Sequence, residues 1–161
     1  NWSWDKIDNN RIYLDVESRK NSISFRNNMF RLAKQLIQEK DTSRAEEILD
    51  LSLEKMPIEK YGHYGICLSY PELYYRLGKI EKARNVSEKL IRVFDEKLRY
   101  YAAFNENYLE AIFEGIERNL NMYRSVLGDA DRFEEDQTYL ATLQAEFVKS
   151  IQQFEYLMGE E

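Results

Sequence analysis

The sequence predicts an all-α protein built from antiparallel helix pairs, and two observations support this fold class. The chain of 161 residues contains only six glycines and two prolines, about 5% of the total where average usage is about 12%. So few turn-forming residues indicate few, long elements and argue against sandwiches and barrels, which need frequent turns. Apolar residues also recur at helical spacing over most of the chain. The length fits one domain with a substantial core.

The first part of the chain predicts a lead-in followed by a helix pair. Residues 1–22 are polar and irregular, and we expect an extended lead-in that packs against the body. Helical periodicity begins at Ser24, and its first apolar stripe consists of Phe25, Met29, Leu32, Ala33, Leu36 and Ile37. The second helix is expected to begin with a capping box of Ser43 and Glu46 and to end at Pro57, which cannot continue it.

The middle of the chain predicts a loop and a second helix pair. Tyr61–Gly65 is expected to be the loop, and the apolar segment 66–77 that follows contains Pro71. We expect a helix that kinks at this proline; the alternative is a helix that begins at a second capping box, Ser69 with Glu72. Gly78 is expected to close the helix, and another helix covers about 83–94.

Two long apolar stripes follow, from Leu98 to Tyr123 and from Phe133 to Met158, with a turn expected at Gly128–Asp131. Gly115 stands alone inside a predicted helix, which indicates close packing. We therefore predict a single helical domain over residues 23–161. It would contain about six helices, in pairs over about 24–57, 64–95 and 97–158.

The first two pairs resemble each other. Leu36 precedes Ala45 by nine residues, and Tyr74 precedes Ala83 by nine. The pattern is similar to the tetratricopeptide repeat, in which a small residue in the second helix admits the large residues of the first. The alanines are 38 residues apart, against a repeat length of about 34, and Ser87 replaces the expected aromatic. We predict a degenerate, right-handed superhelical stack; the alternative is a plain helical bundle.

A second resemblance covers most of the chain. Its motifs are Arg11-Ile-Tyr-Leu-Asp15, Arg26 with Arg31-Leu-Ala33 and Leu36-Ile37, Arg44-Ala45 with Leu49-Asp50 and Met56-Pro57, Tyr74-Tyr75 with Gly78 and Lys82-Ala83, and Leu98 with Tyr100-Tyr101. The chain resembles the soluble C-terminal region of a family of uncharacterised bacterial multi-spanning membrane proteins. The membrane half of these proteins looks like a glycosyltransferase of the protein O-mannosyltransferase type.

This resemblance implies that the chain is a tail whose membrane half precedes it, and its start at Asn1, without Met, fits such a fragment. The tail would face the periplasm, with the cytoplasmic side as the alternative. Any residues that catalyse sugar transfer would then lie outside this chain.

The composition excludes several kinds of metal site and disfavours some classes of partner. One histidine and one cysteine exclude sites that use several of either, such as zinc sites with several histidines and iron–sulfur centres. The net charge of −6 disfavours nucleic acid and anionic membrane surfaces as partners. No apolar run approaches the roughly 18 residues of a membrane span, so we expect no direct membrane insertion. We predict no metal, no cofactor and no catalytic residues.

Individual side chains suggest few sites. His63 is expected to be a loop residue and Cys67 a buried apolar one. The acidic runs Glu46-Glu47 and Glu134-Glu135-Asp136 could supply paired carboxylates, but acids at helix starts more often interact with the helix dipole. Arg19, Arg26 and Arg31 could bind a carboxylate or phosphate, or form surface salt bridges.

Helix-repeat proteins commonly bind partners along the groove lined by the first helix of each pair. The candidate groove here consists of Asn27, Phe30, Arg31, Lys34, Gln38, Leu68, Glu72, Tyr75 and Arg76. We therefore predict a non-catalytic interaction module that binds a protein, a peptide or its own membrane domain. The alternative is a domain that binds a small ligand or processes glycans with paired carboxylates and tyrosines.

Overall fold

The computed structural model describes residues 15–104 and 108–154, and these ranges contain helices and no strand. The helices are α1 (Val16–Gln38), α2 (Thr42–Lys55), α3 (Ile58–Tyr61), α4 (Tyr64–Cys67), α5 (Tyr70–Arg76), α6 (Ile80–Ala102), α7 (Leu109–Phe133) and α8 (Gln137–Gln152). The all-α fold class is thus confirmed. Two of these helices, α3 and α4, are single turns of four residues.

The chain forms two compact units, Asn1–Lys79 and Ile80–Glu161. The boundary falls inside the second expected pair, residues 64–95, so the association of its two segments stays a prediction, as does the superhelical stack. No helix in the described ranges is long and apolar enough to cross a membrane.

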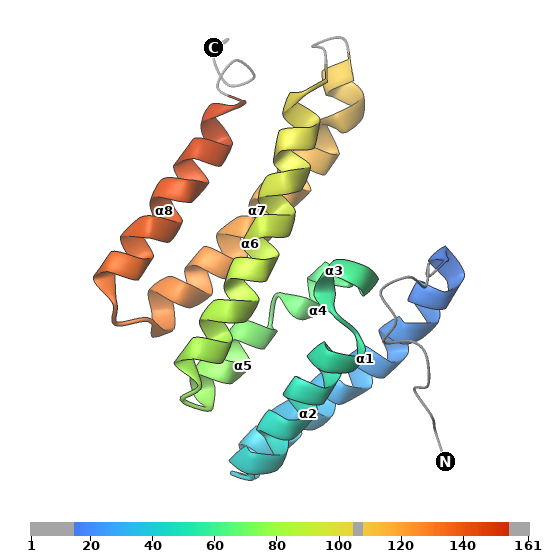
Figure 1. Ribbon diagram of the computed structural model, residues 1–161, viewed down its shortest axis with the longest axis vertical. Helices are drawn as coiled ribbons and strands as arrows, with labels where there is room; N and C mark the ends of the chain where they lie inside the picture. The colour runs from blue at the N-terminus through green and yellow to red at the C-terminus, as the bar shows by residue number, and fades with distance from the viewer. Residues whose placement is uncertain (1–14, 105–107, 155–161) are drawn as a thin grey trace. The chain divides into compact units, whose positions relative to one another are not determined.

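In the first unit, α1 and α2 form an antiparallel pair (Figure 1). Ala33 and Leu36 on α1, and Ala45 and Leu49 on α2, are almost fully buried. Between the helices, Lys40 adopts the left-handed conformation with φ of 64°. The backbone N–H of Asp41 donates to the carbonyl of Leu36 at 2.9 Å. This Schellman arrangement closes α1 in one tight turn.

The end of α5 repeats this arrangement 38 residues later in the chain. Gly78 has a φ of 69°, and the N–H of Lys79 donates to the carbonyl of Tyr74 at 2.9 Å. The positions of Lys40 and Gly78 correspond in the sequence repeat. The likeness between the two segments therefore extends to the backbone geometry at their helix ends.

Polar bonds hold α5 to α2 inside the first unit. The hydroxyls of Ser52 and Tyr70, both fully buried, lie 2.7 Å apart, and Tyr74 donates to Asp50 at 2.8 Å. The ring of Tyr70 also stacks on Phe30 of α1, with centroids 6.0 Å apart. The tyrosines of α5 therefore connect it to both longer helices of the unit.

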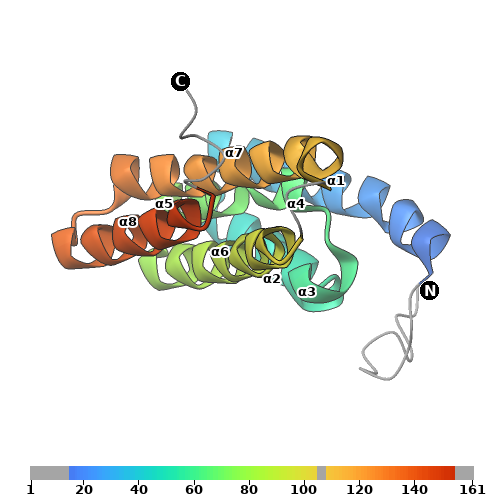
Figure 2. The ribbon, with the colours of Figure 1, turned by 90° about the horizontal axis from the view of Figure 1, so that it is seen from above.

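In the second unit, α6 packs along α7, and α8 follows after a short turn (Figure 1). Figure 2 shows α6 and α8 on the same side of α7. Among the described residues of the unit, the buried apolar side chains are Ala83, Val86, Leu90, Ile91, Phe94, Leu98, Ile116, Tyr123, Val126, Ala130, Leu140, Leu143 and Phe154. A side chain added at Gly115 would meet the Tyr101 hydroxyl of α6 at 2.7 Å, so the indication of close packing at Gly115 is confirmed.

An ion pair stabilises the turn between α7 and α8. Glu134, 7% exposed, accepts a hydrogen bond from Arg84 of α6 at 2.7 Å and further bonds from the backbone N–H groups of Glu135 and Asp136. Asp136 caps α8 by accepting from the N–H groups of Thr138 and Tyr139. One guanidinium thus connects all three helices of the unit.

Two expected helix boundaries of the first unit are wrong. The N-cap of α2 is Asp41, which accepts from the N–H of Arg44 at 3.2 Å, and Ser43 lies inside the helix. The Schellman turn leaves room for the helix to begin two residues earlier. The expected kink at Pro71 is replaced by two helices, because α4 ends at Cys67 and Pro71 occupies the first turn of α5, where its missing N–H is tolerated.

Two other boundaries are displaced. The helix α6 continues through Lys97 to Ala102, since the segment Asp95–Arg99 holds neither glycine nor proline and four of its five residues favour a helix. The expected turn at Gly128–Asp131 is helical and belongs to α7. Val126 and Ala130 are fully buried on either side of Gly128, so packing overrides the weak helix propensity of glycine.

The expected lead-in is helical from Val16 onward, so α1 begins before the point at which the periodicity becomes visible. Residues 1–14 of that lead-in, most of the motif Arg11–Asp15, and Asn105 and Met158 of the predicted stripes lie outside the described residues.

The two glycines of α7 provide a matched stability test. A Cβ at exposed Gly128 meets nothing within 4 Å, whereas one at Gly115 meets Tyr101. Gly128→Ala is expected to stabilise the protein by about 0.5–1 kcal/mol through helix propensity. Gly115→Ala is expected to destabilise it by about 1 kcal/mol through overpacking. Urea unfolding measures both, and an equal gain in the two variants would contradict the close approach at Gly115.

Candidate functional site

Five of the nine residues of the predicted groove surround one hollow in the first unit. Phe30, Lys34 and Gln38 of α1 face Glu72 and Arg76 of α5 across a space of about 140 Å³. Ile37, Ser69 and Leu73 complete its lining. The hollow forms because the ring of Tyr70 stacks on Phe30 and so holds the two helices together. Phe30, Ile37 and Leu73 give the hollow an apolar part, and Lys34, Glu72 and Arg76 give it charges.

The other four residues of the predicted groove do not line the hollow. Asn27 and Arg31 are exposed on α1, and Leu68 is half-buried between α4 and α5. Tyr75 is 8% exposed and belongs to the core. Helical periodicity placed these residues near one another, but it could not show how far each side chain turns away from the neighbouring helix.

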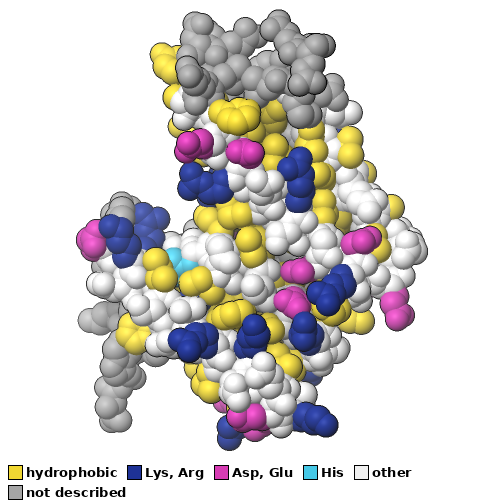
Figure 3. All heavy atoms as spheres, turned by 180° about the vertical axis from the view of Figure 1, so that it is seen from behind, with side chains coloured by type: hydrophobic (Ala, Val, Ile, Leu, Met, Phe, Trp, Pro, Cys, Tyr) yellow, Lys and Arg dark blue, Asp and Glu magenta, His cyan; other side chains and the backbone are white. Residues whose placement is uncertain are grey.

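The charge of this surface is positive, against the negative charge of the whole chain. Arg76 is bound by Glu72 at 2.6 Å, while no described residue forms an ion pair with Arg31 or Lys34. In Figure 3, Lys and Arg side chains gather in a row over the first unit, with hydrophobic surface between them. The surface therefore offers cations and apolar contact together.

The three arginines do not form an exposed anion site. Arg26 is fully buried; it donates to the carbonyl of Met56 and, from Nε, to Nδ1 of His63 at 3.3 Å, and its guanidinium lies 5.9 Å from the ring centre of Tyr70. Arg19 is half-buried, and its backbone carbonyl lies 2.8 Å from Nε2 of His63. Arg31 is on the exposed side of the helix.

His63 is a structural residue held in one tautomer. Because Nδ1 accepts from Arg26, the proton lies on Nε2, which donates to the carbonyl of Arg19. Burial lowers the pKa of His63, and the neighbouring positive charges of Arg26 and Arg19 lower it further, although the bond to the Arg19 carbonyl opposes them. The neutral imidazole is the form that the fold requires.

Cys67 is fully buried, as predicted. Burial raises the pKa of its thiol to about 11, so the reactive thiolate is scarce at neutral pH.

The predicted carboxylate pairs are used by the fold. The hydrogen bond from Arg84 lowers the pKa of Glu134, which is the reverse of what a general acid needs. Glu46 is bound to Lys79 at 2.8 Å. Glu47 lies with Glu46, Asp50 and Glu54 along the surface of a single helix, α2. These contacts favour structural roles for the acidic residues.

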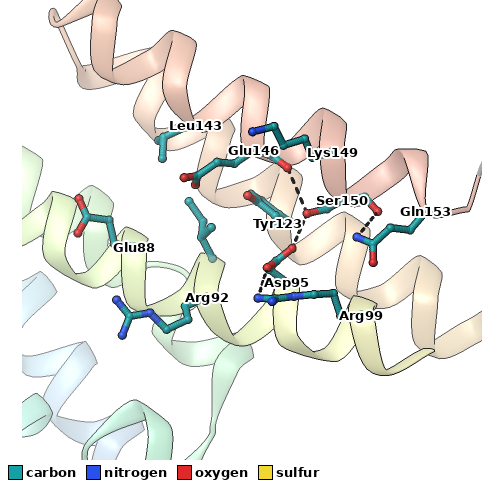
Figure 4. Close-up of a pocket in the computed structure, with 11 residues that line it drawn as sticks. Glu88, Arg92, Asp95, Arg99, Tyr123, Leu143, Glu146, Lys149, Ser150 and Gln153 are labelled. Carbon is teal, nitrogen blue, oxygen red and sulfur yellow. Dashed lines mark hydrogen bonds and ion pairs between the residues drawn. The ribbon is translucent and has the colours of Figure 1, made fainter. Parts of the chain in front are cut away.

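A larger hollow, which the sequence did not suggest, lies in the second unit. Its volume is about 560 Å³, and Figure 4 shows side chains from α6, α7 and α8 around it. Ile91 and Leu143 supply buried apolar walls, and Tyr123, whose ring centroid lies 4.9 Å from that of Phe147, also lines the space. The sequence carried one signal for this hollow, which is a row of charged residues at helical spacing along one face of α6: Glu88, Arg92, Asp95 and Arg99.

One end of this second hollow is closed by a chain of hydrogen bonds. Arg99 donates to one oxygen of Asp95 at 2.5 Å, Ser150 donates to the other at 2.6 Å, and the side chain of Gln153 donates to the carbonyl of Ser150 at 3.4 Å (Figure 4). Asp95 therefore has both oxygens occupied. The charged side chains of the hollow that form no ion pair within the described residues lie elsewhere on its rim.

Comparison of the chain with models of protein families, with curated proteins and with solved structures finds no match.

The buried histidine predicts a dependence of stability on pH. The pKa of His63 is lower in the folded than in the unfolded chain, where it is about 6.5. The unfolded chain therefore binds the proton first, so this stabilisation is complete above about pH 6.5 and decreases as the pH falls below it. Urea unfolding of the wild type at pH 7.5 and 5.0 is expected to show this loss.

The matched variant for this measurement is His63→Asn. Asparagine does not titrate and tolerates the left-handed conformation of this position, which has a φ of 56°. The variant is expected to lose less stability between the two pH values than the wild type. An identical loss in both proteins would show that His63 does not carry the dependence.

Proposed function

We propose that the chain is a non-catalytic interaction module that binds a polypeptide segment in the hollow between α1 and α5. The observation that carries the proposal is the gathering of Phe30, Lys34, Gln38, Glu72 and Arg76 around one space. Apolar contact with a charged rim is a common composition of protein recognition surfaces.

The charge of the hollow selects the kind of partner. Lys34 lines the hollow and Arg31 is exposed on the same helix, and neither has an ion-pair partner within the described part of the chain. Opposite charge across an interface accelerates encounter and suppresses wrong partners. The partner is therefore a segment with acidic and apolar side chains, from another protein or from the protein's own membrane domain.

The architecture that accompanies this function is a degenerate tetratricopeptide-like stack. Its support is the repeated Schellman turn at Lys40 and Gly78 and the full burial of Ala45 and Ala83 at matching positions. By its resemblance to the bacterial membrane-protein family, the chain is the soluble tail of a glycosyltransferase-like protein and faces the periplasm.

Charge reversal tests the hollow. Peptides that combine Asp or Glu with Leu or Phe are expected to bind the chain in fluorescence anisotropy, and Lys34→Glu is expected to weaken this binding about tenfold, which is about 1.4 kcal/mol. Lys20→Glu is the control, because Lys20 lies on α1 beside Glu17 and outside the hollow. Equal binding by Lys34→Glu and the wild type, or equal binding of basic peptides, would contradict the proposal.

The membrane assignment has its own test. The gene is expected to encode several membrane spans upstream of Asn1, each about 20 apolar residues long. Sequencing this region measures the prediction directly. If no spans precede the chain, the resemblance to the membrane-protein family is set aside, while binding in the hollow remains subject to the peptide experiment.

A further inference from the structure

The hydroxyl of Tyr123 is the starting point. It lies against the hollow of about 560 Å³ in the second unit, is fully buried, and has no hydrogen-bond partner in the described ranges. Burial and then the charges of Glu146 and Asp95 raise its pKa, so the hydroxyl keeps its proton and is a donor. A buried donor without an acceptor is costly to a fold and calls for a specific explanation.

The rim of the hollow carries charges that are not used by the fold. Glu88 and Arg92 stand one turn apart on α6, and Glu146 and Lys149 stand one turn apart on α8 (Figure 4). Both spacings allow ion pairs within a helix. Yet none of these four groups forms an ion pair with any residue of the described ranges, whereas Arg99 and Asp95 beside them do.

The signs of these free groups define the ligand. Two acids and two bases surround the same space, so its free charge is balanced and does not favour a ligand of one sign. Its volume lies within the roughly 300–1,000 Å³ of pockets that hold compact organic ligands. Ile91 and Leu143, which are 5% and 3% exposed, add an apolar wall.

We propose that this hollow binds a small zwitterion that carries an ammonium and a carboxylate group, either a free apolar amino acid or a short peptide. Arg92 takes the carboxylate, since guanidinium geometry matches it in a bidentate manner. Glu146 takes the ammonium group, and the Tyr123 hydroxyl donates to an oxygen of the ligand. This site lies in a different unit from the polypeptide-binding hollow and is independent of it.

Calorimetric titration of the full chain tests the ligand class. The probes are leucine, the tripeptide Ala-Leu-Ala, and the same tripeptide with its N-terminus acetylated or its C-terminus amidated. At least one of the two zwitterions is expected to bind saturably, and blocking either end is expected to weaken tripeptide binding about tenfold. Comparison of leucine with the tripeptide distinguishes a free amino acid from a peptide.

Variants of the site separate binding from stability. Tyr123→Phe is expected to weaken binding about tenfold while its melting temperature stays the same or rises, because the variant removes an unpartnered buried hydroxyl. Arg92→Gln, on the exposed rim, is expected to weaken binding without affecting the fold. Glu117→Gln, on the exposed side of α7, is the control and is expected to bind as the wild type does.

Three results would overturn the proposal. They are no binding of leucine or Ala-Leu-Ala at millimolar concentration, equal binding of blocked and unblocked peptides, and unchanged binding by Arg92→Gln. If Tyr123→Phe fails to fold, Arg92→Gln still decides the outcome. These outcomes do not depend on whether the hollow between α1 and α5 binds a polypeptide, because Lys34 is not part of this site.

Discussion

The first unit depends on a buried cation, the guanidinium of Arg26. It lies in the interior without a carboxylate among the described residues, and instead donates to the carbonyl of Met56 and to His63 and faces the ring of Tyr70. A buried charge needs such partners to replace its water, and here they serve Nε and Nη2, while the buried Nη1 has no hydrogen-bond partner in the described ranges. Because these partners come from the end of α2, the turn between α3 and α4, and α5, one side chain connects α1 to the elements that follow it in the first unit.

In the second unit, too, an arginine makes polar contacts that connect the helices. Arg84 of α6 binds Glu134 and Asp136, and its guanidinium stacks over the ring of Tyr139 at 4.5 Å. Each unit therefore holds its helices together with an arginine as well as with apolar packing. Other polar or charged side chains have no hydrogen-bond or ion-pair partner among the described residues. Tyr123 and the rim charges of the second hollow are such residues, and they are the ones a ligand can use.

The sequence predicted the helices better than their ends. Apolar spacing identified the helical class and the stop at Pro57, because these depend on local chemistry, and the repeated spacing of small residues indicated the burial of Ala45 and Ala83. It missed the cap at Asp41 and the continuous helix through Gly128, where packing of Val126 and Ala130 outweighs propensity. In the predicted groove, it placed Tyr75 at the surface although the side chain is buried. Periodicity assigns a residue to a face, but only the neighbouring helix decides whether that face is open.

By itself, the sequence determined an all-helical chain with few turns, a repeated spacing between large and small residues, and a single histidine and cysteine that restrict the chemistry. The tertiary structure decided what the polar residues do. Arg26, expected near the surface, is fully buried, and Glu134, considered as a catalytic acid, is an ion-pair partner of Arg84. The reason is physical: local sequence sets the conformation of the backbone, but the energy of a charge depends on which groups replace its water, and those groups come from distant parts of the chain.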